Sequence, residues 1–323
     1  MNNFWKSYPQ IEEELTNVNE IIKKNIKCRE KFFETSIGDM VDRGGKMLRP
    51  AFLLLAGKFG DYDKKKSHNL AAVIEMLHMA TLVHDDIIDD SKLRRGYETI
   101  QYKYGKEYAV YTGDFLFCQC LMMLSEYEYT MENMKEISKV ISKICMGEVK
   151  QYHLRYARNM NIRNYLRIVS GKTAALFALS FYIGAKESGC NNRVSKSLGR
   201  IGYHIGMAFQ IIDDLLDYKG NTQTLGKNAQ KDLKRGYYTL PLIYALENDQ
   251  ENRIAQRLKE PSLSEEAVNE IVELVKENKG IERAKKVANR YTKKAFDQIN
   301  KLPDCESKAI IYEVVEGLLK RDY

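Results

Sequence analysis

Apolar residues recur at helical spacing through most of this 323-residue chain. One such segment carries Leu70, Val73, Ile74, Leu77, Thr81 and Val83, and another carries Ile137, Val140, Ile141, Ile144 and Cys145. Residues three and four apart share one face of an α-helix, and the alternation of a half-buried strand is almost absent. The pattern predicts an all-α fold of roughly a dozen helices.

Turn residues separate these helices without marking a flexible linker. Pro50 suits the first turn of a helix, and Ser262 with Glu265 has the spacing of a capping box. Charged breaks between helices lie at 61–67, 219–236 and 277–281. The break at 219–236 is the longest and directly follows an acidic run, so we expect a lid there. One domain over residues 1–323 is the simplest organisation.

Composition restricts the class of protein. Apolar residues make up 44% of the chain and charged residues 29%, which suits a large core under a solvated surface. No apolar run approaches the roughly 20 residues of a transmembrane helix, and the N-terminus lacks a signal peptide. We therefore expect a cytoplasmic location. Six cysteines without a CxxC pair indicate neither a zinc site nor a disulfide framework.

The formal charge of +7 is compatible with an anionic substrate, since a charged cleft speeds the capture of charged ligands. Basic and aromatic residues do not interleave as they do in a nucleic-acid groove. We therefore expect no nucleic-acid partner.

Two acidic runs interrupt the apolar pattern. “LVHDDIIDD” at 82–90 holds Asp85, Asp86 and Asp89, and “QIIDDLLDY” at 210–218 holds Asp213, Asp214 and Asp217. The first and fifth residues of each run share a helix face, and the second lies about 100° round it, from roughly 3.6 residues per turn. Each run thus presents two or three carboxylates over one turn.

Oxygen-only ligands favour a hard cation, and Mg²⁺ commonly combines one or two carboxylates with substrate phosphates. The runs therefore predict Mg²⁺ bound together with a diphosphate. The alternative is a solvated acidic face. Apolar flanks and the recurrence of the motif 128 positions later (213 − 85) favour the metal site.

Basic residues that could hold the diphosphate occur in three short stretches: Lys46 and Arg49 in “GGKMLRP”, Arg94 and Arg95 in “LRRG”, and Lys172 and Thr173 in “SGKTAALF”. Helix N-termini and arginine forks both bind phosphate. The third stretch is no P-loop, because Leu166 stands where that motif needs glycine. Each stretch alone could be solvated surface charge. His78 shares a face with Asp85, and the alternative for His78 is a packed core histidine.

These motifs together resemble the trans-prenyltransferases, or polyprenyl diphosphate synthases, over nearly the whole chain. The matching stretches, in family order, are “GGKMLRP”, “EMLHMATLVHDDIIDD”, “LRRG”, “YTGDFLF”, “SGKTAALF”, “GMAFQIIDDLLDY”, “LGKNAQKDL” and “TLPLIYAL”. Within the family, the spacing at 77–82 and the “LGK…DL…TLPLIYAL” segment are most similar to the catalytic component, component II, of heptaprenyl diphosphate synthases.

The resemblance implies a single helical bundle around a deep central cavity, with both acidic motifs at its mouth. All six aspartates would hold three Mg²⁺ on an allylic diphosphate. The residues implied to bind that diphosphate are Arg94, Lys172, Thr173, Gln210 and Lys227. Those implied to bind isopentenyl diphosphate are Lys46, Arg49, His78 and Arg95, with Lys320 and Arg321 closing over it. Lys172 and the aspartates other than Asp217 would form the catalytic set.

The implied reaction is Mg²⁺-dependent, head-to-tail condensation of isopentenyl diphosphate with an allylic diphosphate, giving an all-trans product. The released diphosphate would act as the base. Two departures from the family pattern occur: Tyr237 replaces a lysine common in short-chain members, and “GKNAQ” replaces “GKPxG”. Neither removes a metal ligand.

Product length is expected to depend on Ala80 and Thr81. Ala80 lies roughly 7–8 Å along the helix from Asp85, at about 1.5 Å per residue, where short-chain members of the family carry an aromatic side chain. A small residue favours a hexaprenyl to octaprenyl product, heptaprenyl above all. The alternative is that Ala80 only packs in the core.

Other functions remain open on the sequence: a farnesyl or geranylgeranyl diphosphate synthase, a terpene cyclase, a non-catalytic partner subunit or a structural bundle. Asp217, Lys46 and Arg49 argue against a terpene cyclase, and the two intact acidic motifs argue against a non-catalytic partner subunit. The resemblance implies a homodimer or a heterodimer with a small regulatory subunit, and peripheral membrane contact during product release.

Overall fold

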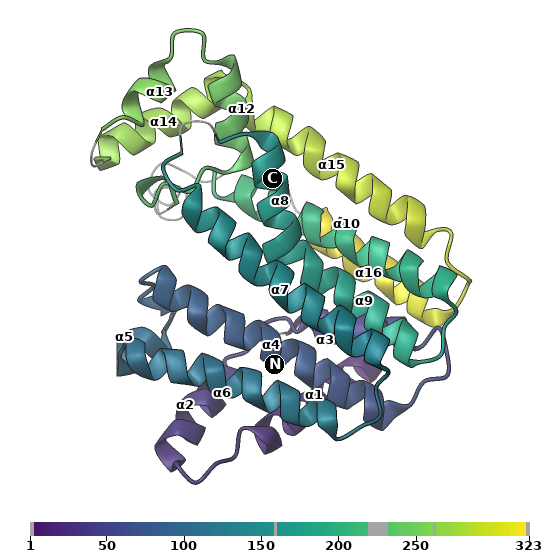
Figure 1. Cartoon of the computed structure of the whole chain (residues 1–323). Coiled ribbons are helices and arrows are strands. Elements are labelled where there is room, and N and C mark those ends of the chain that lie inside the picture. The colour runs from purple at the N-terminus through teal and green to yellow at the C-terminus, as the bar shows by residue number, and fades with distance from the viewer. Residues whose placement is uncertain (1–2, 158–159, 219–231, 261–262, 321–323) are drawn as a thin grey trace. The chain divides into compact units, whose positions relative to one another are not determined.

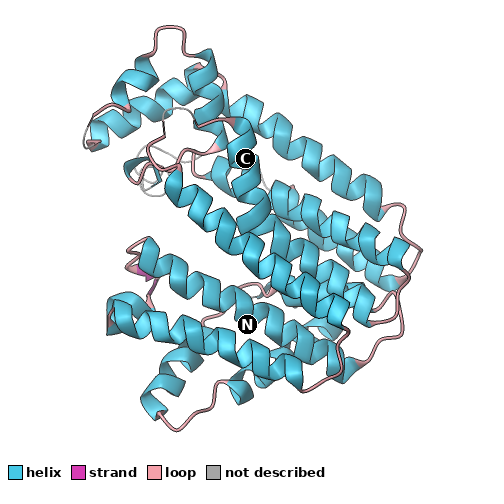
Figure 2. Ribbon diagram, in the orientation of Figure 1, coloured by secondary structure: helices cyan, strands magenta, loops and turns pink. Residues whose placement is uncertain are grey.

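The computed structural model describes residues 3–157, 160–218, 232–260 and 263–320, which are almost entirely helical (Figure 2). The all-α prediction is confirmed. The chain divides into two compact units: unit 1 comprises residues 1–134 and 180–195, and unit 2 comprises residues 135–179 and 196–323. The expectation of one domain over residues 1–323 stays a prediction.

Unit 1 contains the N-terminal helices, coloured purple to blue in Figure 1. Its elements are η1 (Asn3–Trp5), α1 (Pro9–Asn25), α2 (Lys31–Asp42), α3 (Leu48–Gly57), α4 (Lys64–Ile88), β1 (Leu93–Arg94), β2 (Tyr97–Glu98), α5 (Ile100–Tyr104) and α6 (Lys106–Ser125). Pro50 lies in the first turn of α3, as predicted.

Helix α4 is the centre of unit 1 and packs against α1, α3 and α6. It begins after Asp63, whose side chain accepts a hydrogen bond from the Lys66 backbone N–H at 3.0 Å. The apolar positions predicted from Leu70 to Val83 are fully or nearly fully buried, whereas Thr81 in the same pattern is partly exposed. It ends at Ile88, and Asp90 takes a left-handed φ of 44° that turns the chain toward the β-hairpin.

Unit 2 contains most of α7 (Met131–His153), α8 (Ile162–Val169), the π turn η2 (Ser170–Ala174), the start of α9 (Ala175–Glu187), most of α10 (Asn192–Leu216), α12 (Leu240–Asn248), α13 (Arg253–Arg257), α14 (Glu265–Glu277), α15 (Gly280–Ile299) and α16 (Glu306–Leu319). Helix α12 packs against α14 and α15. The segment predicted from Ile137 to Cys145 lies inside α7, as expected.

The predicted capping box is wrong. Helix α14 begins at Glu265, and its N-cap is Ser264, whose hydroxyl accepts from the Ala267 N–H at 3.1 Å. Glu265 is therefore the first helical residue and not the third, which a capping box requires. Ser262 lies outside the described residues.

The continuous helical stretch Ile162–Glu187 is long and apolar enough, by length and composition, to cross a membrane. This differs from the expectation that no apolar run in the sequence approaches transmembrane length. Its apolar window is 78% buried inside the protein, as the core helix of a globular protein would be. The stretch is therefore weak evidence for a membrane span.

A buried carboxylate ties α1 to α3 and α4 within unit 1. Glu14 is 6% exposed and accepts from Tyr62 Oη, from Lys58 Nζ at 2.6 Å and from His68 Nε2 at 3.2 Å. Burial pushes the pKa of Glu14 upward, but the hydrogen bonds from His68, Lys58 and Tyr62 outweigh burial and lower the pKa from 4.5 to about 2. The cluster is thus organised around an ionised Glu14.

Glu14→Gln is expected to lower the free energy of unfolding by about 3 kcal/mol at neutral pH, because removing one member of a buried pair leaves the other charge uncompensated. The lowered pKa sets the pH dependence. This stabilisation is fully present above the unfolded-state pKa near 4.5 and is lost as pH falls toward 2. Urea denaturation at pH 7 and pH 3 measures both effects.

Glu13→Gln is the matched control, because the Glu13 side chain is 74% exposed and lies 3.9 Å from Lys64. Its free energy of unfolding should stay within about 0.5 kcal/mol of wild type. Equal stability of Glu14→Gln and wild type at pH 7 would contradict the role assigned to this cluster.

Candidate active site

The first acidic motif lies at the C-terminal end of α4, and Asp89 is the C-cap residue of that helix. Asp86 is 6% exposed, whereas Asp85 and Asp89 are half-buried. The Asp89 N–H donates to the Asp85 carbonyl at 2.8 Å, so the helical turn extends to the fifth position of the motif. Asp85 and Asp89 therefore share one side of the helix, as residues four apart do, and Asp86 lies on another.

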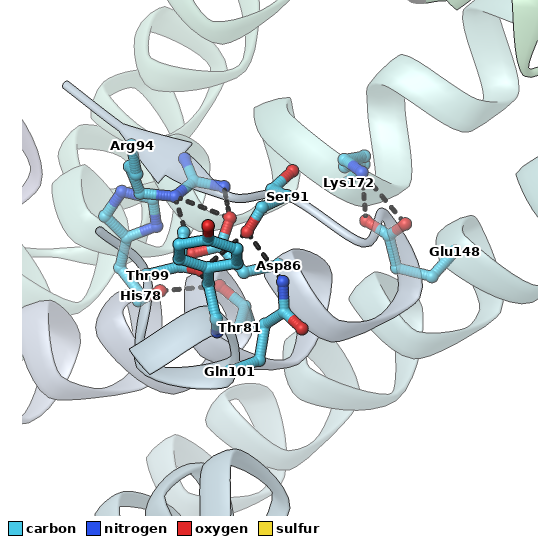
Figure 3. A network of polar contacts seen from close by, with 10 residues as sticks. His78, Thr81, Asp86, Ser91, Arg94, Thr99, Gln101, Glu148 and Lys172 are labelled. Atoms are coloured by element: carbon cyan, nitrogen blue, oxygen red, sulfur yellow. Dashed lines mark hydrogen bonds and ion pairs between the residues drawn. The ribbon is translucent and has the colours of Figure 1, made fainter. Parts of the chain in front are cut away.

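Arg94 on strand β1 forms hydrogen bonds to both oxygens of the Asp86 carboxylate. Its Nε donates to both carboxylate oxygens at 3.0 Å, and a terminal nitrogen donates to Oδ1 at 2.8 Å (Figure 3). Forked, charge-assisted hydrogen bonds of this kind fix orientation as well as charge. Arg94, which the resemblance assigns to the allylic diphosphate, is thus a partner of the first acidic motif in this structure.

A two-residue turn presents the neighbouring arginine. Strands β1 and β2 pair antiparallel, and Arg95 and Gly96 between them both have positive φ, at 54° and 83°. Such turns suit the twist of a hairpin, but a non-glycine residue in this region is strained. The Arg95 guanidinium lies against the backbone of Gly45, where a Cβ would be 2.5 Å from a terminal nitrogen. Gly45 therefore allows Arg95 to approach the “GGKMLRP” stretch.

Arg49, His78 and Arg95, which were predicted to bind isopentenyl diphosphate, form one electrostatic group in unit 1. Burial lowers the pKa of Arg49 from 12.5 to about 10, Glu75 opposes this and Arg95 adds to it. Burial and then the positive charges of Arg49, Arg95 and Arg94 lower the pKa of His78 well below 6.5. At neutral pH, His78 is therefore uncharged while Arg49 keeps its charge.

Lys46 is positioned by the N-terminal residues of the same unit. Its Nζ lies 4.8 Å from the centroid of the Phe4 ring, and its carbonyl accepts from Trp5 Nε1 at 2.5 Å. The aromatic pair therefore holds both the main chain and the side chain of Lys46. This contact between η1 and the “GGKMLRP” stretch was not predicted.

Sequence reasoning also missed Glu75, which lines a pocket together with Asp86, Arg94 and Arg95. Burial raises the pKa of Glu75, and the charges of Arg49 and Arg95 oppose that rise. Glu75 could have been recognised in the sequence as a glutamate that lies three residues before His78 in an apolar run. It compensates part of the positive charge gathered around it.

The second acidic motif, in unit 2, repeats the burial pattern of the first. Asp214 is 8% exposed, whereas Asp213 is exposed and Asp217 is half-buried. Asp214 accepts from Tyr165 Oη at 2.5 Å and from Gln210 Nε2 at 2.9 Å. In both motifs, protein donors hold the second aspartate, and the first and fifth positions are more accessible.

A chain of hydrogen bonds connects this motif to the “SGKTAALF” stretch. Thr173 Oγ1 donates to Gln210 Oε1 at 2.8 Å, and Gln210 in turn donates to Asp214. The predicted residues Thr173, Gln210 and Asp214 are therefore brought together. Tyr165, which completes the set, was missed because nothing in the sequence marks a tyrosine that lies 49 positions from its partner.

Negative charge gathers around Asp214. Burial raises its pKa from 3.8 to about 8, the hydrogen bonds from Tyr165 and Gln210 oppose this rise, and Asp232 and Asp217 add to it. Asp232 was not predicted as a site residue. A divalent cation would compensate such a group of carboxylates, because a nearby opposite charge favours the ionised form.

Lys172 lies in the π turn η2 and forms an ion pair with Glu148 on α7. Its Nζ is 2.9 Å from each carboxylate oxygen of Glu148 (Figure 3). π turns inside helices occur frequently at functional sites. Glu148 was not predicted. The structure thus gives Lys172, like Arg94, a protein carboxylate as its partner.

The carboxylates of the two motifs suit Mg²⁺ by their chemistry, since their donors are hard oxygens. Among the described residues, no group of three His, Cys, Asp or Glu side chains already converges on one point. Mg²⁺ that is held by one or two carboxylates takes its remaining ligands from phosphate oxygens and water. The residues present therefore fit Mg²⁺ as part of a diphosphate complex.

The residues predicted to control product length lie on α4, where Ala80 is fully buried and Thr81 is partly exposed. The Thr81 hydroxyl donates to the His78 carbonyl at 2.7 Å. The pocket described above is not lined by Ala80, so its role in product length stays a prediction. Lys227, Arg321 and residues 219–231 of the expected lid lie outside the described residues.

Comparisons with known proteins identify the family of this chain. A model of the polyprenyl synthetase family matches residues 30–275. The chain is 38% identical over 285 residues to heptaprenyl diphosphate synthase component 2 of Bacillus subtilis, covering 88% of this chain and 81% of that protein.

Two solved structures are similar over nearly the whole chain. One is geranylgeranyl pyrophosphate synthase from Lactobacillus brevis, with a TM-score of 0.94, 33% identity, and coverage of 98% of this chain and 99% of that one. The other is heptaprenyl diphosphate synthase from Staphylococcus aureus, with a TM-score of 0.90, 32% identity, and coverage of 97% and 99%. This chain belongs to the polyprenyl synthetase family.

Proposed function

We infer that this protein is a trans-prenyltransferase that elongates an allylic diphosphate with isopentenyl diphosphate, head to tail, to a medium or long all-trans polyprenyl diphosphate. One observation carries this inference: each of two acidic motifs keeps its second aspartate buried and hydrogen-bonded, with the first and fifth positions accessible. Family membership supplies the substrate class.

We assign metal contact to the accessible positions Asp85, Asp89, Asp213 and Asp217, and an orienting role to Asp86 and Asp214. Mg²⁺, three ions as the family resemblance implies, would offset the charge that develops on the departing diphosphate. Arg94 and the Tyr165–Gln210 pair keep the buried aspartates in place, so the accessible carboxylates stay oriented.

Two sets of residues in this chain bind the two substrates. Lys172 and Thr173 hold the allylic diphosphate, and their contacts strengthen as negative charge builds up during cleavage of the allylic C–O bond. Arg49 and Arg95, with Lys46 and neutral His78, hold isopentenyl diphosphate so that its double bond meets the allylic cation. The departing diphosphate takes the proton that the condensed product loses, and no side-chain base is assigned.

The test is to incubate the purified chain with isopentenyl diphosphate, farnesyl diphosphate and Mg²⁺, and to size the products. We expect hexaprenyl to octaprenyl diphosphates, with heptaprenyl predominant. Relatives named for geranylgeranyl and for heptaprenyl products both resemble this chain in overall structure, with TM-scores of 0.94 and 0.90, so product sizing decides the length. Absence of any elongated product, alone and with an added partner subunit, would refute the function.

Ala80→Phe is expected to shorten the product, because the ring would block the path of the growing tail near α4. Later condensations should slow more than the first. The graded series Ala80→Val, Leu and Phe should shorten the product in that order, measured by chromatography of the dephosphorylated products. Ala80→Ser, similar in volume, is the matched control, and melting temperatures report overpacking. An unchanged product distribution in Ala80→Phe, together with a lowered melting temperature, would show that Ala80 only packs in the core.

We propose that a second copy of this chain covers an apolar face of α6. Tyr111, Leu121 and Met122 are 70%, 62% and 60% exposed, and Cys118 between them is exposed as well. Exposed apolar stripes of this kind mark interaction sites. The alternative, a different small subunit, comes from the relative named component 2.

Leu121→Asp is expected to convert a dimer to a monomer in sedimentation equilibrium, because an interface core tolerates a charge poorly. Leu93→Asp, at a leucine that is 60% exposed outside α6, is the matched control and should stay dimeric. A wild-type chain that is monomeric alone would contradict the homodimer and favour the heteromeric alternative. The cytoplasmic location also stays a proposal, which cell fractionation would test.

A further inference from the structure

The Glu148–Lys172 pair is built into a close crossing of two helical segments in unit 2. A Cβ on Gly147 would lie 3.0 Å from the Lys172 amide nitrogen, and one on Gly171 would lie 2.9 Å from the Lys143 carbonyl oxygen. The backbones of α7 and η2 therefore touch where each segment carries a glycine. The residue that follows each glycine contributes one member of the ion pair.

This crossing fixes where the two charged groups meet. Lys172 Nζ lies 2.9 Å from both Glu148 oxygens, with the lysine side chain 30% exposed and the glutamate side chain 22% exposed. Next to Lys172, Thr173 begins the hydrogen-bond chain to Gln210 and Asp214. Glu148 thus lies beside the residues assigned to the allylic diphosphate, and the reaction described above gives it no role.

We propose that Glu148 is a counter-ion for Lys172 that a diphosphate must displace, and that Glu148 thereby sets how tightly this site holds diphosphate. The proposal rests on the proposed function, in which Lys172 binds the allylic diphosphate. Glu148 is a positioning residue here. It pairs with the Lys172 ammonium group in the absence of diphosphate, and the ion pair forms again when the diphosphate dissociates.

The expected size of the effect follows from the pair itself. A partly exposed ion pair contributes up to about 1 kcal/mol, and a carboxylate close to a bound polyanion adds repulsion. Together they should weaken diphosphate binding about 10-fold. Each condensation leaves one inorganic diphosphate at this site, so a weaker hold speeds its departure before the next condensation. Glu148 would therefore lower affinity and favour repeated turnover.

Calorimetric titration of inorganic diphosphate in the presence of Mg²⁺ tests the proposal without a catalytic readout. Glu148→Gln, which keeps the shape and removes the charge, should bind about 10-fold more tightly than wild type, a change of about 1.4 kcal/mol. In a Lys172→Gln background, the same substitution should change the dissociation constant less than about two-fold. Such coupling isolates the pairwise interaction. Steady-state kinetics should show a lower KM for the allylic substrate together with a lower kcat.

Glu136→Gln is the matched control, since Glu136 lies on the same helix and pairs with Lys139 at 2.6 Å; its affinity for diphosphate should equal that of wild type. Equal or weaker binding by Glu148→Gln, or a gain that persists without Lys172, would overturn the proposal. If the affinities change as expected but wild type forms no prenyl product, the proposed function fails and the counter-ion role stands. If product forms but Glu148→Gln gains no affinity, only the counter-ion role fails.

Discussion

Asp85→Ala and Asp213→Ala are each expected to lower turnover about 10²- to 10³-fold, the usual cost of removing one electrostatic stabiliser from an active site. Each residue is an accessible position of its motif, so the substitution would remove the proposed Mg²⁺ contact without creating a cavity in the core. The helices α4 and α10 should therefore stay folded, with unchanged circular dichroism.

Asp90→Ala is the matched control for this prediction. Asp90 directly follows the first motif, is exposed, and pairs with Lys106 at 3.0 Å, so its loss should leave turnover close to wild type. The affinity for Mg²⁺ in the presence of inorganic diphosphate should fall in Asp85→Ala and Asp213→Ala and remain unchanged in Asp90→Ala. Near-normal turnover of both motif variants would refute the assignment of the acidic motifs.

Arg49→Ala is expected to raise the KM for isopentenyl diphosphate roughly 10- to 100-fold, because a hydrogen bond to a charged group contributes about 1.5–3 kcal/mol. Lys46→Ala should act in the same direction. Lys172→Ala should instead raise the KM for the allylic diphosphate. Arg49 belongs to the electrostatic group with His78 and Arg95, whereas Lys172 pairs with Glu148 in the other unit.

Initial rates with one substrate saturating and the other varied measure these changes separately. Arg43→Ala is a suitable control: Arg43 also lies near the “GGKMLRP” stretch, but its guanidinium stacks over the Tyr97 ring at 4.7 Å and pairs with Asp39. Its KM values should stay close to wild type. If the Arg49 and Lys172 variants impair the same substrate alone, the division of the site into two binding regions is wrong.

Much of the fold and part of the site could be predicted from local patterns. The helical spacing from Leu70 to Val83 predicted a helix, and the DDxxD spacing predicted which aspartates share a side of it. Both predictions depend on residues within a few turns of each other. Which residues share one side of a helix follows from the geometry of that helix alone, without knowledge of the helices packed against it.

The partners of the charged residues could not be predicted in this way. Arg94 was expected to bind substrate, and the structure pairs it with Asp86. Lys172 was expected to bind substrate as well, and it pairs with Glu148, 24 positions away. The relevant distances depend on a positive-φ turn at Arg95 and on the glycine crossing of α7 and η2, and neither feature leaves a periodic signal.

The helical class, the two acidic motifs and the basic stretches therefore follow from the amino-acid sequence, because each of these is a property of consecutive residues. Helix packing, in contrast, fixes which aspartate of each motif is buried, the hydrogen bond from Tyr165 to Asp214, and the ion pair of Glu148 with Lys172. Burial and ion pairing depend on which surfaces meet when helices pack. The free energy of ionising a carboxylate depends on those neighbours and not on its position along the chain.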